Sequence, residues 1–321
     1  MYAMAKQLIT IVLNELRVLI RERTFILLLG VFLLMTLFSS YIGWTTKTTI
    51  LAIYRASVLS LQHAGVMNIP SNPFTGIPAL SIFRNMIIYI FLIGSLLSIV
   101  MGHRAFMRER KSRVIQLVFS KPVQKQTFIV GKMIGIATAL FSIILITFFI
   151  SVISTFIIPH QQLSLLEIEK LSLFYLISFI YMLIFAMIGL WAAVIFDTES
   201  LALLVPVMIW IAVTFIFPEL TTGQNPVALL NPTNIVVITP QGAFFDFMQR
   251  VLAPFSLEQQ YTGITQPLLE TQKQFQSLSV ATALIQTVPS IFSLLVYCVL
   301  TLILNVYALK RYTVTNDKIY E

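Results

Sequence analysis

The residues with the clearest chemical potential lie in one segment, Arg108–Lys132. Seven of its 25 residues are Lys or Arg, in a chain that has 21 such residues in all. The segment ends in Gly131-Lys132, the pair that also closes a phosphate-binding P-loop. The glycine-rich part of that loop is missing, and Met133 stands where Ser or Thr would follow. The chain is therefore predicted not to hydrolyse ATP by a P-loop.

Other groups that could perform chemistry are scattered. The histidines, His63, His103 and His160, are far apart and form no H-E-x-x-H motif, so we expect solvated or interfacial side chains and no metal site. Asp197 and Glu199 lie two residues apart in the short sequence "FDTES". We expect a solvated turn there, in which Asp or Ser caps the next helix. No catalytic residues are predicted.

The composition is that of an integral membrane protein. Hydrophobic residues make up 58% of the chain and charged residues 11%, where soluble proteins have roughly 45–50% and about 25%. The mean hydropathy is +0.89. The single cysteine, Cys298, excludes an intramolecular disulfide. The net charge of +8 gives little reason to expect nucleic-acid binding, because the basic residues cluster at the ends of apolar segments.

Six segments are long and apolar enough to cross a bilayer as helices, since a span needs about 20 such residues. We predict an all-α membrane protein with one domain over residues 1–321 and spans at about 25–44, 83–102, 133–158, 171–196, 201–217 and 288–309. Two external segments, 45–82 and 218–287, should separate the first from the second span and the fifth from the sixth. The latter could form a short helix or lid, or simply pack on the ends of the spans.

No Asp, Glu, Lys or Arg is expected in the middle of any predicted span. Proton-coupled transporters, voltage sensors and intramembrane hydrolases generally need ionisable groups at that depth. The energy source is therefore expected outside the membrane. Uncharged spans favour an apolar or amphipathic cargo, although a dimer interface could also enclose water.

The positive charges predict the orientation. Fifteen of the 21 Lys and Arg residues lie on the side that holds both termini and the segment 103–132. By the positive-inside rule this side is cytoplasmic. We therefore expect a multi-pass protein of the prokaryotic cytoplasmic (inner) membrane with both termini in the cytoplasm.

Two cytoplasmic helices are predicted. Residues 7–23 have apolar positions at helical spacing, which indicates an amphipathic helix in the membrane interface, with a frayed tail as the alternative. Residues 108–125 combine an apolar ridge with flanking charges, and Pro122 should end the helix. Such a segment between two spans could dock in a groove of a partner protein, or it could be an ordinary basic loop without a partner.

The basic segment resembles a family motif. "RERKSRVIQLVFSKPVQKQTFIVGK" is similar to the pattern E-R-x-x-G-T-L-x-x-L-L-x-x-P-V-x-R-x-x-x-x-x-G-K of ABC-2 type permeases. "NELRVLIRERTF" resembles their elbow helix, and "LNPTNIVV" and "LAPFSLEQQYTGITQPLL" resemble their external segment before the last span. Within the family, the six-span group that includes the nitrous-oxide-reductase maturation permeases is the most similar. Arg113-Val114 and Lys125 depart from the usual Gly-Thr and Arg.

The resemblance implies the membrane subunit of an ABC transporter, which moves a substrate by using ATP hydrolysed in a separate chain. ATP and Mg would be bound by two copies of that ATPase, with no cofactor in this chain, and a second permease copy would complete a homodimer in the lipid bilayer. The alternatives are an ABC-type mechanotransmission complex that acts on an envelope partner without moving solute, and a membrane enzyme. The residues implied for ATPase coupling are Glu109, Arg110, Lys111, Val114, Leu117, Val118, Ser120, Pro122, Val123 and Lys125, and those for the elbow helix are Glu15, Arg17 and Arg21.

Cysteine labelling tests the predicted orientation. Single cysteines at Gln241 and Gln161 should react with an impermeant reagent added to intact cells, whereas cysteines at Gln124 and Asn316 should not. Labelling of the Gln124 variant from outside would contradict the cytoplasmic position of the basic segment.

Overall fold

Six long helices dominate the structure. The computed structural model describes residues 2–21, 23–65, 78–112, 115, 120, 124–157, 163–222, 242–271 and 279–312. Six helical stretches in these ranges are long and apolar enough to cross a membrane. The described residues contain no strand. The predicted all-α architecture with six spans is confirmed.

The spans follow each other in chain order, and some contain breaks in the α-helical pattern. Four spans are single helices: α2 (Thr24–His63), α6 (Lys125–Ile157), α7 (Leu165–Ile195) and α12 (Val280–Arg311). The second span is made of η1 (Ala79–Phe83), α3 (Arg84–Tyr89), η2 (Ile90–Gly94) and α4 (Ser95–Lys111) in succession. The fifth is made of α8 (Glu199–Ile211), η3 (Ala212–Ile216) and α9 (Phe217–Thr222). The remaining helices are α1 (Tyr2–Arg21), α10 (Ala243–Leu252), η5 (Ala253–Phe255) and α11 (Leu257–Leu268).

The helix starts follow from local capping. Ser164 accepts from the Glu167 amide, and the Glu167 side chain reaches back to the Ser164 amide, so α7 begins with a capping box. At α8 the cap is Thr198, whose hydroxyl accepts from the Leu201 amide. The prediction that Asp or Ser of "FDTES" caps this helix was wrong, because Asp197 is engaged elsewhere, as described below.

The centre of the bundle is the packing of α4 against α7. In the most apolar window of these two spans 67% and 72% of the residues are buried, against 22% in the spans of α8 and α12. Two glycines allow the backbones to approach. A Cβ atom on Gly102 would lie 1.8 Å from the Ala186 carbonyl oxygen, and one on Gly189 would lie 2.3 Å from the Ile99 carbonyl oxygen. Small residues serve this purpose at helix interfaces in membranes.

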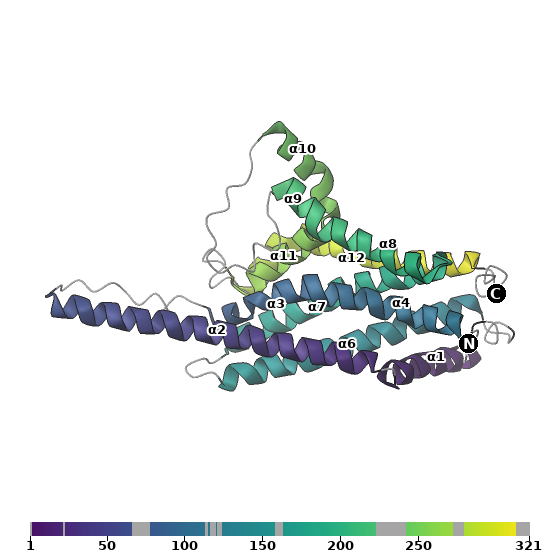
Figure 1. Cartoon of the computed structure of the whole chain (residues 1–321), viewed down its shortest axis with the longest axis horizontal. Helices are drawn as coiled ribbons and strands as arrows, with labels where there is room; N and C mark the ends of the chain where they lie inside the picture. Colours follow the sequence, from purple (N-terminus) through teal and green to yellow (C-terminus); the bar gives the residue numbers. More distant parts are fainter. Residues whose placement is uncertain are drawn as a thin grey trace.

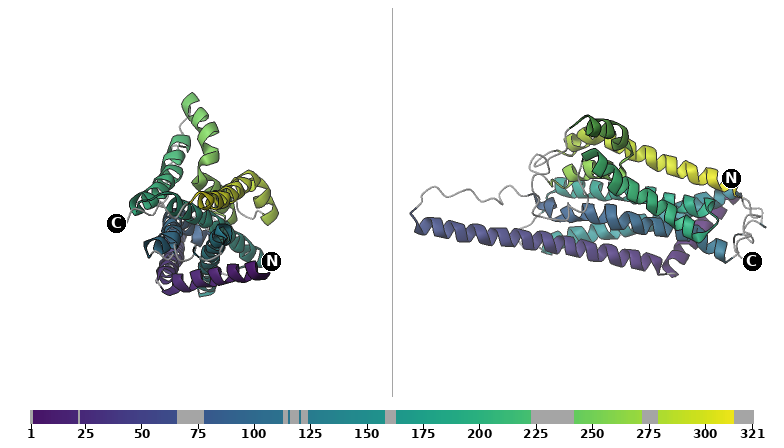
Figure 2. Two further views of the ribbon diagram at one scale, coloured as in Figure 1. Left: turned by 90° about the vertical axis from the view of Figure 1, so that its right-hand side faces the viewer. Right: turned by 45° about the horizontal axis from the view of Figure 1, so that its top comes forward.

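The start of the chain in α1 and the end of α12 lie at the same end of the bundle (Figure 1). There α1 runs across the other helices instead of along them, and it packs on α6 (Figure 2). This end also holds the last turn of α4 and the first turn of α6, which flank the basic segment.

At the opposite end α2 extends far beyond its neighbours (Figure 1). The apolar stretch predicted as the first span ends at Trp44, but the helix continues without a break to His63. Its 40 residues correspond to about 60 Å, roughly twice the thickness of a bilayer core. The second half of α2 is therefore a projection from the bundle.

Two π-helical turns lie close together in the bundle. Trp210, just before η3, donates its indole N–H to the Ser95 hydroxyl at 2.7 Å, directly after η2. The Ser95 hydroxyl in turn donates to the Phe91 carbonyl. These hydrogen bonds satisfy polar groups at the π-turn in η2, where the regular hydrogen-bond ladder is interrupted.

The close contact between α4 and α7 can be tested with alanine. Gly102→Ala should lower stability by about 1–3 kcal/mol, because the added methyl group would force the two backbones apart. Gly30→Ala is the matched control, since nothing lies within 4 Å of a Cβ at Gly30. The measurement is the thermal unfolding midpoint of each purified variant in detergent. Equal midpoints for Gly102→Ala and the wild type would contradict the described packing.

Candidate functional site

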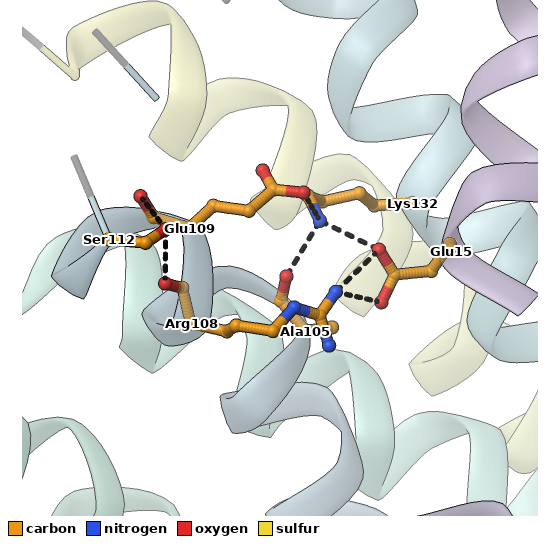
Figure 3. A network of polar contacts seen from close by, with 6 residues as sticks. All are labelled: Glu15, Ala105, Arg108, Glu109, Ser112 and Lys132. Carbon is orange, nitrogen blue, oxygen red and sulfur yellow. Dashed lines mark hydrogen bonds and ion pairs between the residues drawn. The ribbon is translucent and has the colours of Figure 1, made fainter. Parts of the chain in front are cut away.

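A cluster of four charged side chains lies where α1, α4 and α6 meet (Figure 3). Lys132 of α6 is at its centre. The Lys132 ammonium donates to Glu15 Oε2 at 2.8 Å, to Glu109 Oε1 at 2.7 Å and to the Ala105 carbonyl at 2.6 Å. Arg108 of α4 donates to both carboxylate oxygens of Glu15, at 3.1 and 3.2 Å.

The hydrogen bonds compensate for the burial of these charges. Lys132 and Glu15 are each 1% exposed, and an isolated charge would be costly there. A lysine ammonium has three N–H donors, and each of them finds an acceptor in this cluster. Two positive and two negative side chains give no net charge. The cluster is therefore a stable anchor only while all three helices contribute to it.

Two glycines of α6 bring α1 close enough to form the cluster. A Cβ on Gly131 would lie 2.7 Å from Ile11 Cγ2, and a Cβ on Gly135 would lie 2.8 Å from Glu15 Cβ. The glycines are four residues apart and therefore share one face of the helix. This smooth face lets α1 lie against α6 and places Glu15 beside Lys132.

The last turn of α4 is also attached to the turn between α7 and α8. Arg110 is 3% exposed and donates to the Phe196 carbonyl at 2.7 Å and to Asp197 Oδ1 at 2.8 Å. Lys111 pairs with Glu199 at 2.5 Å, with both side chains about half exposed. Exposed pairs of the second kind contribute little to stability, so Arg110 is the main connection.

A third attachment reaches the end of α12. Lys125, the first residue of α6, donates to the Tyr312 carbonyl at 2.7 Å. The Tyr312 ring packs edge-on against Phe106 of α4, with 5.5 Å between ring centroids, and lies 5.8 Å from the Arg110 guanidinium carbon. The helix that enters the basic segment and the helix that leaves it are therefore both joined to the C-terminal span.

This arrangement joins both flanks of the basic segment to several other helices. The segment between Lys111 and Lys125 is held at both ends by contacts to α1, α7, α8 and α12. A push on that segment would reach most of the bundle. Within the described ranges, no group of three or more His, Cys, Asp or Glu side chains is placed to hold a metal ion.

The predicted site residues fall into three groups. Glu15, Glu109, Arg110, Lys111 and Lys125 lie in the network just described. Ser120 is exposed, as are Arg17 and Arg21 of α1. The third group, which lies outside the described residues, comprises Val114, Leu117, Val118, Pro122 and Val123.

Sequence reasoning missed the role of Lys132. The third span was predicted to start at Met133, but α6 begins eight residues earlier, so that Lys132 is a buried helical residue. The available signal was the sequence "GKMIG", in which two glycines with helical spacing flank the lysine. That spacing is typical of a close helix contact and would have marked this face of α6.

Comparison with known families shows to which family the chain belongs. The family model described as "ABC-2 family transporter protein" matches residues 9–314, nearly the whole chain. The chain belongs to this ABC-2 transporter family. It is a permease subunit of an ABC transporter, a multi-pass membrane protein whose family works with an ABC ATPase. A search of curated proteins gave no significant match.

The charge cluster of the permease predicts a large effect of removing its central cation. Lys132→Met removes the counter-charge of Glu109 and leaves Glu15 with Arg108 alone, so the cluster keeps an excess negative charge, and such a change costs about 3–5 kcal/mol. Lys111→Met removes an exposed pair and should cost less than about 1 kcal/mol. Thermal unfolding midpoints of the purified variants measure both effects. The double variant Glu15→Gln/Lys132→Met should recover part of the loss, and no recovery would show that the cluster is not a unit.

Proposed function

We propose that this permease transmits the movement of a separate ATPase to its membrane spans and so moves a substrate across the cytoplasmic membrane. In this proposal residues 108–125 form the coupling segment, which docks in a cleft of the ATPase. Two permease copies form a homodimer that binds two ATPase copies. The chain has no catalytic role, and ATP and Mg are bound by the partner.

The charge cluster around Lys132 is the observation that carries this proposal. A coupling segment is effective only if the helices on both sides of it move when it is pushed. Here α4 ends and α6 begins within a network that also holds α1, the turn between α7 and α8, and the end of α12. Closure of the ATPases would therefore displace several spans together.

The distribution of charge supports the orientation. Both ends of the basic segment lie beside α1 and the end of α12, which is the side favoured as cytoplasmic by the positive-inside rule. The amphipathic helix α1 exposes Arg17 and Arg21 there. We propose that α1 is the elbow helix of the permease and lies in the inner interface of the membrane.

We propose a substrate class from the composition of the spans. Their lack of charge supports an apolar or amphipathic cargo. The motif resemblance supports a place near the nitrous-oxide-reductase maturation permeases within the family.

A second candidate function is mechanical, and α2 favours it. The second half of this helix projects from the end opposite the coupling segment and exposes Ile50, Ile53 and Leu59. A partner in the cell envelope could bind this projection and receive movement without any solute crossing the membrane. Release of cargo from sealed vesicles that contain permease and ATPase would support transport, whereas movement of α2 without release would support the mechanical function.

Substitution of Leu117 tests the coupling segment. Burying a leucine contributes about 1.5–3 kcal/mol, and an aspartate would add the cost of desolvating a charge. Since about 1.4 kcal/mol is tenfold in affinity, Leu117→Asp should weaken binding of the ATPase at least tenfold. Co-purification of the two subunits measures this loss, and membrane abundance of the permease should stay normal.

Two controls accompany this test. Lys125→Gln should weaken ATPase binding less than Leu117→Asp, because it removes one positive charge and its hydrogen bond to the Tyr312 carbonyl but places no new charge in the interface. The purified permease alone should show no ATPase activity. If Leu117→Asp binds the ATPase as tightly as the wild type does, residues 108–125 are an ordinary basic loop.

A further inference from the structure

Helix α11 is not one of the spans, yet it lies among them. It packs against α7, α12 and η3. Glu270, just after its end, forms a buried ion pair with Lys170 in the first turns of α7. Tyr261 stacks on Tyr181, near the middle of α7, with 4.5 Å between ring centroids. The start of α11 therefore lies deeper along α7 than its end, at membrane depth.

This arrangement places an acidic side chain where none was expected from the sequence. Glu258, in the first turn of α11, is 5% exposed. Glu270 at the other end of the helix has Lys170 as a counter-charge. No Lys, Arg or His in the described part of the chain forms an ion pair with Glu258. One buried carboxyl of this helix is neutralised by a partner and the other is not.

Two buried hydroxyl groups lie near Glu258. Tyr181 lies within electrostatic reach of the Glu258 carboxyl, and Thr214 of η3 lies near Tyr181. Both hydroxyls are fully buried, and within the described part of the chain neither makes a hydrogen bond of normal length. The neighbouring hydroxyls of Ser178 and Tyr261 bond to each other at 2.8 Å. Buried polar atoms without partners are rare, and here two of them gather beside an ionisable group.

The described elements around α11 offer no other buried charge to balance Glu258. The buried titratable groups of α7 are Tyr175, Tyr181 and Lys170, and the lysine is already paired with Glu270. From η3 and α12 there is no acidic or basic side chain between Ala212 and Ile216 or between Val280 and Leu309, where Tyr297 donates to the Pro254 carbonyl. Arg84 of α3 and Glu219 of α9 are both exposed.

These features point to a proton as the ligand. A protonated carboxyl group is neutral and can donate to a hydroxyl oxygen, so it needs neither a cation nor additional space. A carboxylate at this place would be an uncompensated buried charge. In agreement with this, burial raises the pKa of the Glu258 carboxyl to about 7.

We propose that Glu258 is a proton-binding site at membrane depth and that its protonation controls the docking of α11 against α7, α12 and η3. In the protonated state α11 lies as the structure shows it. Loss of the proton leaves a charge that is stabilised best when the first turn of α11 moves away from α7 toward water. In the proposed orientation the pH that acts on this site is that of the external side.

The direction of the pH effect follows from linkage. The docked state holds the proton more tightly than a solvated glutamate, whose pKa is 4.5. Below pH 4.5 both states are protonated and docking is strongest. Between pH 4.5 and 7 only the docked state keeps its proton, so docking weakens as the pH rises. Above pH 7 it stays weak. The docking equilibrium should fall roughly tenfold or more between pH 5 and pH 8.

The first test is the thermal unfolding midpoint of the purified full-length protein from pH 5 to pH 8.5. Glu258→Gln imitates the protonated group and should raise the midpoint above that of the wild type at pH 8. The difference between the two proteins should be smallest at pH 5. Glu219→Gln removes an exposed acid and should follow the wild type throughout. A constant difference between Glu258→Gln and wild type over this range would overturn the proposal.

A second test follows α11 directly and does not depend on global stability. In a Cys298→Ala background, Ile264→Cys places a thiol on the buried face of α11. Gly263→Cys places one on its exposed side, where a Cβ meets only Ser290 Oγ at 3.7 Å. We divide the maleimide labelling rate of Ile264→Cys by that of Gly263→Cys, so that the pH dependence of the thiol reaction itself is removed. This ratio should rise roughly tenfold or more from pH 5 to pH 8 and should stay constant when Glu258→Gln is added.

Both tests have outcomes that exclude the proton site. A labelling ratio that does not change with pH, or that changes equally with Glu258→Gln, would contradict proton-controlled docking. The midpoint at pH 8 should also be the same in sodium, potassium and choline chloride at equal ionic strength. Stabilisation by sodium or potassium that disappears in Glu258→Gln would assign the site to a metal cation instead.

Discussion

The burial of the Lys132 ammonium group determines how α1, α4 and α6 pack at the end of the permease that holds both termini. Lys132 has three N–H donors, and the acceptors come from α1 and from two positions on α4. No single helix could supply all of them, so burial of the lysine requires α1, α4 and α6 to assemble in one register. The glycines at 131 and 135 serve the same requirement, because a side chain at either would move α1 away. A charge that is costly to bury thus becomes a device that specifies the arrangement of three helices.

Buried charges have different surroundings in the two halves of the molecule. At the end that holds both termini, buried charges meet opposite ones, and the contacts hold the flanks of the basic segment to α1, α7, α8 and α12. At the opposite end Lys170 and Glu270 follow the same rule, but Glu258 sits among hydroxyls without a counter-charge. The first kind of site is rigid because any displacement leaves a charge unpaired. The second kind is adjustable, because gain or loss of one proton changes which arrangement is lower in free energy.

The six spans could be predicted because each contains a long apolar run, and such a run can be recognised in the sequence without knowing which helices pack against it. The cluster could not, because helix packing brings Glu15, Glu109 and Lys132 together, and the two glycines of "GKMIG" mark a close contact on α6 without naming the helix or the side chains that meet it. The start of α6 was misplaced since Lys125–Lys132 is too polar to count as membrane, although it is helical. The depth of Glu258 was hidden for a related reason. Hydropathy identifies segments that cross a bilayer, whereas α11 enters beside the spans without crossing.

The length of α2 has a geometric consequence. Its inner part is packed in the bundle, and its outer part continues as one straight rod with nothing described beside it on most sides. A rod fixed at one end amplifies rotation: a tilt of about 10° in the packed part displaces a tip about 30 Å away by roughly 5 Å. Small adjustments among the spans, of the size that side-chain packing tolerates, therefore become displacements of molecular size at His63. The outer end of α2 therefore moves whenever the tilt of its packed part in the bundle changes.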